Sequence, residues 1–135
     1  MKDFDLWNND KKLIEFKDIS KIVCKKRQIW LCKIGENVGN ELSKSNEFIR
    51  PILILNSFLG GDLILILPLT TKYSISYENF LFKLDKKIGL KFDSYVALNQ
   101  IKVISKKRLL NKIINDIGVI KYREIIDKFN EYIKL

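Results

Sequence analysis

The sequence predicts a single, mainly β domain in which short strands curl into a small barrel, with one α-helix at the C-terminal end. Three observations predict this. The chain has 135 residues, of which 47% are hydrophobic, and this suits one domain with one core. From Gln28 onward, short segments rich in β-branched and aromatic residues recur between turn residues. From Tyr122 to Ile133 the apolar residues instead recur at helical spacing.

Five or six short strands are expected before the helix, because each apolar segment is bounded by glycine, proline or polar residues. A long polar loop, Glu36–Phe48, separates the first strand from the others. The expected strands are Ile29–Ile34, Ile52–Leu55, Leu63–Leu67, Phe80–Leu84 and Tyr95–Ile104, the last split by the polar pair Asn99-Gln100. The sequence of Leu109–Ile117 is compatible with either a short strand or a helix, and Gly118 ends this segment.

The segment Pro51–Leu69 is almost wholly apolar and about long enough to cross a bilayer. Its middle, Asn56–Asp62, contains two glycines, which favour a turn, and an aspartate, which is costly in lipid. We therefore interpret it as two buried strands joined by a turn, and we expect no membrane association.

The two ends of the chain differ in character from the strands. Asp10–Phe16 has helical apolar spacing, so residues 1–27 are expected to form a partly helical N-terminal extension to a domain that spans residues 28–135. At the other end, one face of the predicted helix is apolar and the opposite face is charged, which indicates a helix that caps the barrel. The apolar face consists of Tyr122, Ile125, Ile126, Phe129, Tyr132 and Ile133.

The composition favours a polyanionic partner and excludes several kinds of site. The formal net charge is +9, which favours nucleic acid through counterion release, although a lysine-rich proteome explains such a charge equally well. The chain has no histidine, and Cys24 and Cys32 are its two cysteines, so a usual structural zinc site is excluded. The acidic N-terminus does not resemble a signal peptide. We expect a cytoplasmic protein that uses neither metal nor cofactor.

Three places carry candidate functional side chains. Arg50 precedes Pro51 where the loop enters a buried strand, and its head group is expected at the surface. Thr70-Thr71-Lys72 follows the next strand, where hydroxyls and an amine can bind phosphate. Glu41 lies in the long loop and can pair with Arg50 or with a base edge. Each place also has a purely structural explanation. Arg50 can form a salt bridge at the sheet edge, Thr70-Thr71-Lys72 can be an ordinary polar strand end, and Glu41 can be a solvated loop carboxylate.

The order of these features along the chain resembles the MazF/PemK toxins of type II toxin–antitoxin systems. The resemblance covers about Gln28–Leu135. The motifs that carry it are Ile29-Trp30-Leu31-Cys32-Lys33-Ile34, Gly35 through Val38-Gly39-Asn40-Glu41, Arg50-Pro51-Ile52-Leu53-Ile54-Leu55, Ile66-Leu67-Pro68-Leu69-Thr70-Thr71, Ser94-Tyr95-Val96-Ala97-Leu98-Asn99-Gln100-Ile101-Lys102-Val103-Ile104 and Lys107-Arg108-Leu109.

The resemblance implies an SH3-like curled β-barrel of the MazF/PemK/CcdB kind, usually a homodimer, that cleaves single-stranded RNA without metal. It implies catalytic roles for Arg50, Thr70 and Glu41, and inhibition by a cognate acidic antitoxin whose disordered tail crosses the active groove. The expected products are a 5′-hydroxyl and a cyclic or 3′-phosphate. RNA contacts are expected from Lys44, Ser45, Thr71 and Lys72.

The sequence departs from the family at positions that affect substrate preference. Leu42 follows Glu41 where the family usually has glutamine, and Asn99 replaces an acidic residue before Gln100. Two alternatives stay open. One is a toxin of the same fold that acts on a protein such as DNA gyrase. The other is a basic nucleic-acid-binding barrel without catalysis.

Overall fold

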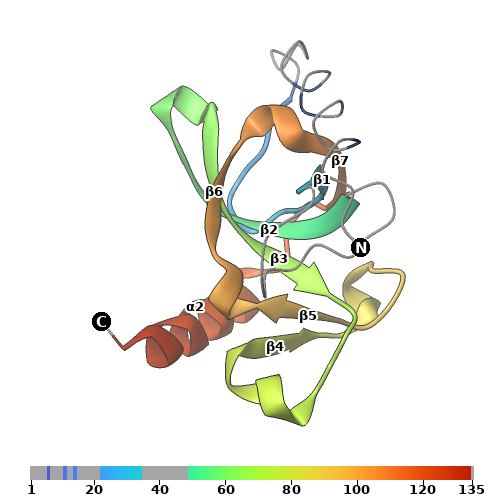
Figure 1. Cartoon of the computed structure of the whole chain (residues 1–135), viewed down its shortest axis with the longest axis vertical. Coiled ribbons are helices and arrows are strands. Elements are labelled where there is room, and N and C mark those ends of the chain that lie inside the picture. Colours follow the sequence, from blue (N-terminus) through green and yellow to red (C-terminus); the bar gives the residue numbers. More distant parts are fainter. Residues whose placement is uncertain (1–5, 7–10, 12–13, 15–21, 35–48, 135) are drawn as a thin grey trace.

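The computed structural model describes residues 6, 11, 14, 22–34 and 49–134. Residues 22–34 and 49–134 contain one curled β-sheet and a C-terminal helix (Figure 1). The predicted mainly β fold with a C-terminal helix is confirmed. The described strands are β1 (Ile29–Lys33), β2 (Ile49–Phe58), β3 (Leu63–Thr70), β4 (Leu81–Leu84), β5 (Ser94–Ala97), β6 (Lys102–Ser105) and β7 (Leu109–Ile114), and the helix is α2 (Val119–Ile133). Short 3₁₀ helices connect them: η2 (Leu59–Gly61), η3 (Ile75–Phe80), η4 (Lys86–Ile88), η5 (Leu98–Gln100) and η6 (Lys106–Arg108).

The strands pair antiparallel in the order β4-β5-β3-β2-β1-β7, and β6 pairs with β3 beside this path. Because β4 and β7 stand at the two edges, the curled sheet is not closed into a full barrel. The described residues form seven strands, more than the five or six expected. The difference arises because η5 divides the long segment after Ser94 into two strands, and because Leu109–Ile114 is a strand.

The hairpin of β2 and β3 is buried on both faces, which explains why its sequence is continuously apolar rather than alternating. On one face, Leu53 and Leu67 pack in a core that reaches Ile125 of α2. On the other face, Ile52 and Ile66 pack in a second core. Burying each such side chain fully contributes about 1.5–3 kcal/mol, so this hairpin anchors both cores.

The predicted turn within Pro51–Leu69 is confirmed, since η2 joins β2 to β3. In the part of the chain that the structure describes, no helix combines the length and apolar character needed to span a membrane. Cys24 and Cys32 are free thiols, the second of them buried.

Two prolines end the pairing between β2 and β3. The last paired residues of this ladder are Ile52 and Pro68, and Pro51 comes next on β2. Proline has no backbone N–H to donate, so the ladder does not continue past this point. β3 instead pairs onward with β5, at Leu69 and Val96. The residues just beyond the two prolines therefore lie where the two strands are no longer hydrogen-bonded to each other.

The segment before β1 joins the body of the fold, although most of the predicted extension 1–27 lies outside the described residues. The backbone N–H of Arg27 donates to the carbonyl of Ile54 at 3.0 Å. The Arg27 guanidinium donates to both carboxylate oxygens of Asp116, at 3.0 and 3.3 Å, and this lowers the pKa of Asp116. The segment thus links the central hairpin to the connection between β7 and α2.

Gly89 is expected to be the most sensitive glycine of the described turns. Its φ is +121°, which favours glycine, and a Cβ there would lie 2.7 Å from Cδ1 of Ile114. Gly89→Ala should therefore lower the free energy of unfolding by about 1–3 kcal/mol, measured by thermal denaturation. Gly60→Ala is the control, because Gly60 also has a positive φ, +67°, but no atom lies within 4 Å of its added Cβ. Equal losses in both variants would contradict the role of the Ile114 contact.

Candidate active site

Arg50 and Thr70 lie on one face of the sheet, just beyond the point where the pairing of β2 with β3 ends. Ile52 and Pro68 are the last paired residues of β2 and β3, and two residues farther along each strand stand Arg50 and Thr70. Side chains alternate along a strand, so both residues lie on the same face as Ile52. Both are buried, with 9% of Arg50 and 6% of Thr70 exposed. The opening of the β2–β3 ladder thus has a guanidinium on one strand and a hydroxyl on the other.

The burial of Arg50 corrects the expectation that its head group lies at the surface. Its neighbour on β1 is Cys32, which is fully buried. Burial lowers the pKa of the Arg50 guanidinium from its ordinary value. The ordinary value is so high that the group still carries its charge at neutral pH. A partly desolvated guanidinium interacts more strongly with a phosphate than one in open water.

The hydroxyl of Thr70 is held in place by its own turn. The backbone N–H of Lys72 donates to Thr70 Oγ1 at 3.1 Å. Because this bond uses the oxygen as acceptor, the hydroxyl proton remains available for donation to a ligand oxygen. Thr70 also lines a cavity of about 450 Å³. The other lining residues are Lys72, Tyr77, Phe80, Leu81, Ala97, Asn99 and Gln100.

The cavity beside Thr70 offers groups suited to a nucleobase. Tyr77 and Phe80 come from η3, and their ring centroids lie 5.3 Å apart. Asn99 and Gln100 come from η5 and supply amide donors and acceptors. Aromatic rings stack on bases, and amides can hydrogen-bond with base edges. Of these residues, the sequence indicates Asn99 and Gln100 as a break in a strand and as part of a family motif from which Asn99 departs. Phe80 is expected to begin a strand but is the last residue of η3, and no pattern in the sequence indicates Tyr77 as a site residue.

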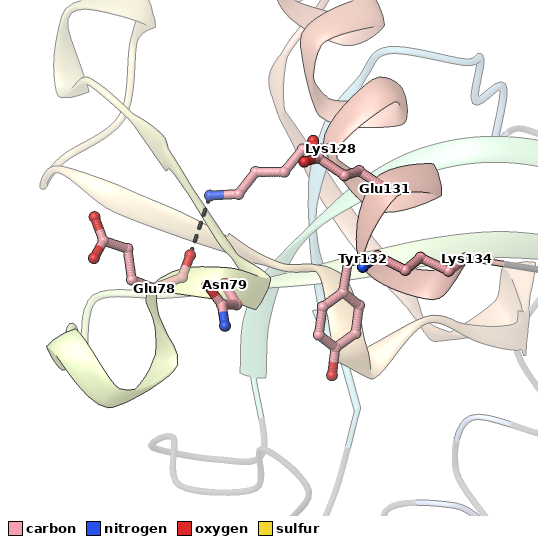
Figure 2. A pocket seen from close by; sticks show the side chains of 6 residues that line it. All are labelled: Glu78, Asn79, Lys128, Glu131, Tyr132 and Lys134. Carbon is pink, nitrogen blue, oxygen red and sulfur yellow. Dashed lines mark hydrogen bonds between the residues drawn. The ribbon is translucent and has the colours of Figure 1, made fainter.

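α2 holds η3 against the sheet. Lys128 of α2 donates from Nζ to the carbonyl of Glu78 at 3.1 Å, and also to the carbonyl of Leu81. Figure 2 shows the first of these bonds across a charged hollow of about 630 Å³ between η3 and α2. Its lining residues are Glu78, Asn79, Lys128, Glu131, Tyr132 and Lys134. This hollow is larger than the cavity beside Thr70, but it contains none of the predicted site residues, so we place the site at Thr70.

The structure brings together only part of the predicted set. Thr70 and Lys72 line the cavity, whereas Thr71 lines a different hollow together with Leu31 and Pro51. Arg50 is not among the residues that line the cavity; it lies two residues beyond the last β2–β3 pair. The structure therefore separates Thr71 from Thr70. The other predicted residues, Glu41, Lys44 and Ser45, lie outside the described residues.

The observed arrangement suits the binding of a phosphodiester. A guanidinium offers parallel donors to phosphate oxygens, a fixed hydroxyl offers another, and Lys72 adds positive charge at the cavity. Among the residues that the structure describes, no three of the kinds that ligate metals lie close enough together to hold an ion.

The family whose sequence model matches this chain is described as PemK-like, MazF-like toxin of type II toxin–antitoxin system. The match covers residues 25–133. The chain belongs to this family.

Solved MazF structures share the fold of this PemK-like toxin. MazF from Deinococcus radiodurans superimposes with a TM-score of 0.67 at 15% identity, over 85% of this chain and 100% of that one. The Mycobacterium tuberculosis toxin MazF-mt6 gives 0.60 at 19% identity, over 81% and 98%. An endoribonuclease from a mycobacterial species, solved with its cognate antitoxin, gives 0.58 at 14% identity, over 84% and 97%. No curated protein sequence matches the chain.

Proposed function

We propose that this MazF-like toxin is a metal-independent endoribonuclease that cleaves single-stranded RNA in the cytoplasm and so stops growth. The observation that supports the proposal is that Arg50 and Thr70 lie on the same face of the sheet, just beyond the end of the β2–β3 pairing, and that Thr70 lines a cavity of about 450 Å³. A toxin that acts on a protein target does not need these two side chains on one face at this end of the hairpin. A non-catalytic RNA-binding barrel would keep the charge without a buried arginine.

In the proposed reaction the RNA supplies its own nucleophile. The 2′-oxygen attacks the adjacent phosphorus, the bond from phosphorus to the 5′-oxygen breaks, and the products are a cyclic phosphate and a 5′-hydroxyl. The cyclic product can later open to a 3′-phosphate. Negative charge grows on the phosphoryl oxygens in the transition state, and Arg50 stabilises it with two N–H donors. Thr70 donates its hydroxyl to the same phosphate and aligns it for in-line attack.

Proton transfer needs a group other than Arg50, because a guanidinium is a poor base at neutral pH. Glu41 completes the proposed catalytic set, since it matches the loop glutamate of the family motif. A carboxylate is a chemically suitable acceptor for the 2′-hydroxyl proton. Lys44, Ser45 and Lys72 are proposed to contact the RNA backbone.

The cavity beside Thr70 is proposed to hold one base next to the scissile phosphate. Tyr77 and Phe80 supply an aromatic wall, and Asn99 and Gln100 supply the polar groups that distinguish bases. Because Asn99 replaces the usual acidic residue, we expect a base preference that differs from that of relatives with a carboxylate there.

The experiment that tests the proposal is incubation of the purified protein with structured and unstructured RNA in the presence of a chelator. Endonucleolytic cleavage of the unstructured RNA supports it. Binding without cleavage would favour the non-catalytic alternative. Growth arrest with neither binding nor cleavage would favour a protein target.

We further propose a cognate antitoxin that is acidic and has a segment that folds on binding. The net charge of +9 and a phosphate-binding site favour an acidic chain as a mimic of the substrate. The mycobacterial endoribonuclease of similar fold, solved with its cognate antitoxin, supports an antitoxin as the partner. Affinity should fall strongly with added salt, and an affinity that is indifferent to salt would contradict an electrostatic docking site.

The toxin is expected to be a two-fold homodimer. Apolar residues of α2 are exposed in the single chain, with 53% of Val119 and 80% of Ile120 accessible. An isologous contact is the simplest way for a small barrel to cover such surface. Light scattering at micromolar concentration should give twice the chain mass, and a mass of 15.9 kDa would contradict the prediction.

A further inference from the structure

A row of side chains continues from Thr70 across the sheet, away from Arg50. Thr70 of β3 pairs directly with Tyr95 of β5, and Tyr95 pairs with Lys83 of β4. Residues that pair directly project from the same face of an antiparallel sheet. Lys83 is therefore about 10 Å from Thr70, two strand spacings away, with Tyr95 between them.

The opposite face of β3, β5 and β4 packs against the hydrophobic core. Leu69, Val96 and Leu84 flank the row in sequence, and all three pack in the same buried cluster. Alternation therefore directs Tyr95 and Lys83 away from that core, to the side on which the cavity beside Thr70 lies. Ala97, two residues after Tyr95, lines this cavity.

The ring of a second tyrosine, Tyr73, stacks on the ring of Tyr95 and is partly exposed to solvent. The two ring centroids lie 5.1 Å apart, with an angle of 28° between the planes. Half of Tyr73 is exposed, at 50%. The pair presents an aromatic surface beside the hydroxyl proposed to hold the scissile phosphate, and the exposed ammonium of Lys83 lies on the next strand.

We propose that Tyr73, Tyr95 and Lys83 form a subsite for the single-stranded RNA nucleotide next to the scissile phosphate, on the β4 side of Thr70. This inference rests on the proposed function. The base stacks on the Tyr73–Tyr95 pair, and Lys83 binds the following phosphate. Aromatic stacking tolerates any base, so the subsite adds affinity and register rather than sequence preference.

A shared aromatic and basic surface of this kind fits single-stranded nucleic acid better than it fits a protein partner. Stacked tyrosines with one exposed face offer a flat surface to a base, and a lysine at strand spacing matches a backbone phosphate. A purely structural role, in which Tyr73 packs on Tyr95 to hold the turn after β3, is the competing explanation.

The test is the binding of a 2′-O-methyl RNA oligonucleotide, which cannot react, measured by fluorescence anisotropy with the full chain. Tyr73→Ala should raise the Kd about 5-fold to 100-fold, the loss expected for one stacked base. Tyr73→Phe should stay within about 2-fold of wild type, because the ring is kept. Lys83→Ala should weaken binding and reduce the slope of log Kd against log salt concentration by about 1, the value expected for the loss of one phosphate contact.

Two controls separate the subsite from general effects. Phe58→Ala removes another exposed aromatic ring, at the far end of β2, and Lys26→Ala removes another exposed lysine. Both should bind the probe as wild type does. With unmodified RNA, Tyr73→Ala should raise KM and leave kcat within a few-fold, because stacking acts on bound and reacting RNA alike.

The inference is overturned if the wild-type protein does not bind the probe, if the Kd of Tyr73→Ala equals that of wild type, or if Phe58→Ala loses as much affinity as Tyr73→Ala. It is also overturned if Tyr73→Ala lowers the melting temperature while its folded fraction binds the probe as wild type does. Binding that depends on Tyr73 without any cleavage of unmodified RNA would uphold the subsite and refute the ribonuclease proposal. Cleavage of unmodified RNA that is unaffected by Tyr73→Ala would uphold the ribonuclease proposal and refute the subsite.

Discussion

Arg50→Ala should reduce RNA cleavage per folded molecule by about 10²–10³-fold, the loss that follows removal of one transition-state donor in other enzymes. The physical reason is that the charge growing on the phosphoryl oxygens loses its planar pair of N–H donors. Arg50→Lys should restore little activity, because an ammonium is a point charge without that fork. Turnover is measured with a single-stranded RNA in chelator.

The burial of Arg50 requires a stability control for this variant. Only 9% of Arg50 is exposed, so alanine leaves space at the start of β2 and should lower the melting temperature. Arg50→Met is the matched variant, because it fills much of the same volume without charge. We expect Arg50→Met to be more stable than Arg50→Ala and equally inactive. Turnover per folded molecule that equals wild type in either variant would contradict the proposed mechanism.

Thr70→Ala should reduce cleavage about 10-fold to 100-fold, less than the loss of Arg50, since a neutral hydroxyl donates a weaker bond than a guanidinium. Thr70→Ser keeps the hydroxyl and should retain partial activity. Thr70→Val keeps the shape and should behave as Thr70→Ala does. Single-turnover rates at saturating RNA measure the effect on the chemical step.

Thr71→Ala is the control for the Thr70 series. Thr71 is the next residue in the chain, but it lines a different hollow. The Thr71→Ala variant should therefore have a single-turnover rate close to that of wild type. Equal losses in Thr70→Ala and Thr71→Ala would mean that the end of β3, rather than the Thr70 hydroxyl, is what cleavage requires.

The central hairpin was predictable because its signals are local. Two apolar runs around Asn56–Asp62 leave few alternatives to a buried pair of strands with a turn, and the amphipathic pattern of α2 is equally direct. The order of motifs along the chain placed Arg50 and Thr70 at the start and end of the two strands of this hairpin. The antiparallel register and the alternation of side chains then put both residues on the same face of the sheet, near the end of the β2–β3 pairing.

The burial of Arg50 and the wall of the cavity were not predictable in the same way. Burial depends on neighbouring strands, here β1 with Cys32, which lie far from Arg50 in sequence. η3 is a 3₁₀ helix without an apolar period, so nothing in its sequence indicates that Tyr77 and Phe80 face the cavity. Its position depends on tertiary contacts, among them the bonds from Lys128.

The most direct test of the central claim uses the nucleophile of the RNA itself. A cleavage position is first mapped on a single-stranded RNA in chelator, and the 2′-hydroxyl of the one nucleotide on its 5′ side is then replaced by hydrogen. If Arg50 and Thr70 stabilise the attack of that hydroxyl on the neighbouring phosphate, cleavage at this position should disappear while binding of the RNA is unchanged. Cleavage of the substituted RNA at an undiminished rate would contradict the account, because the attacking oxygen would then have to come from water.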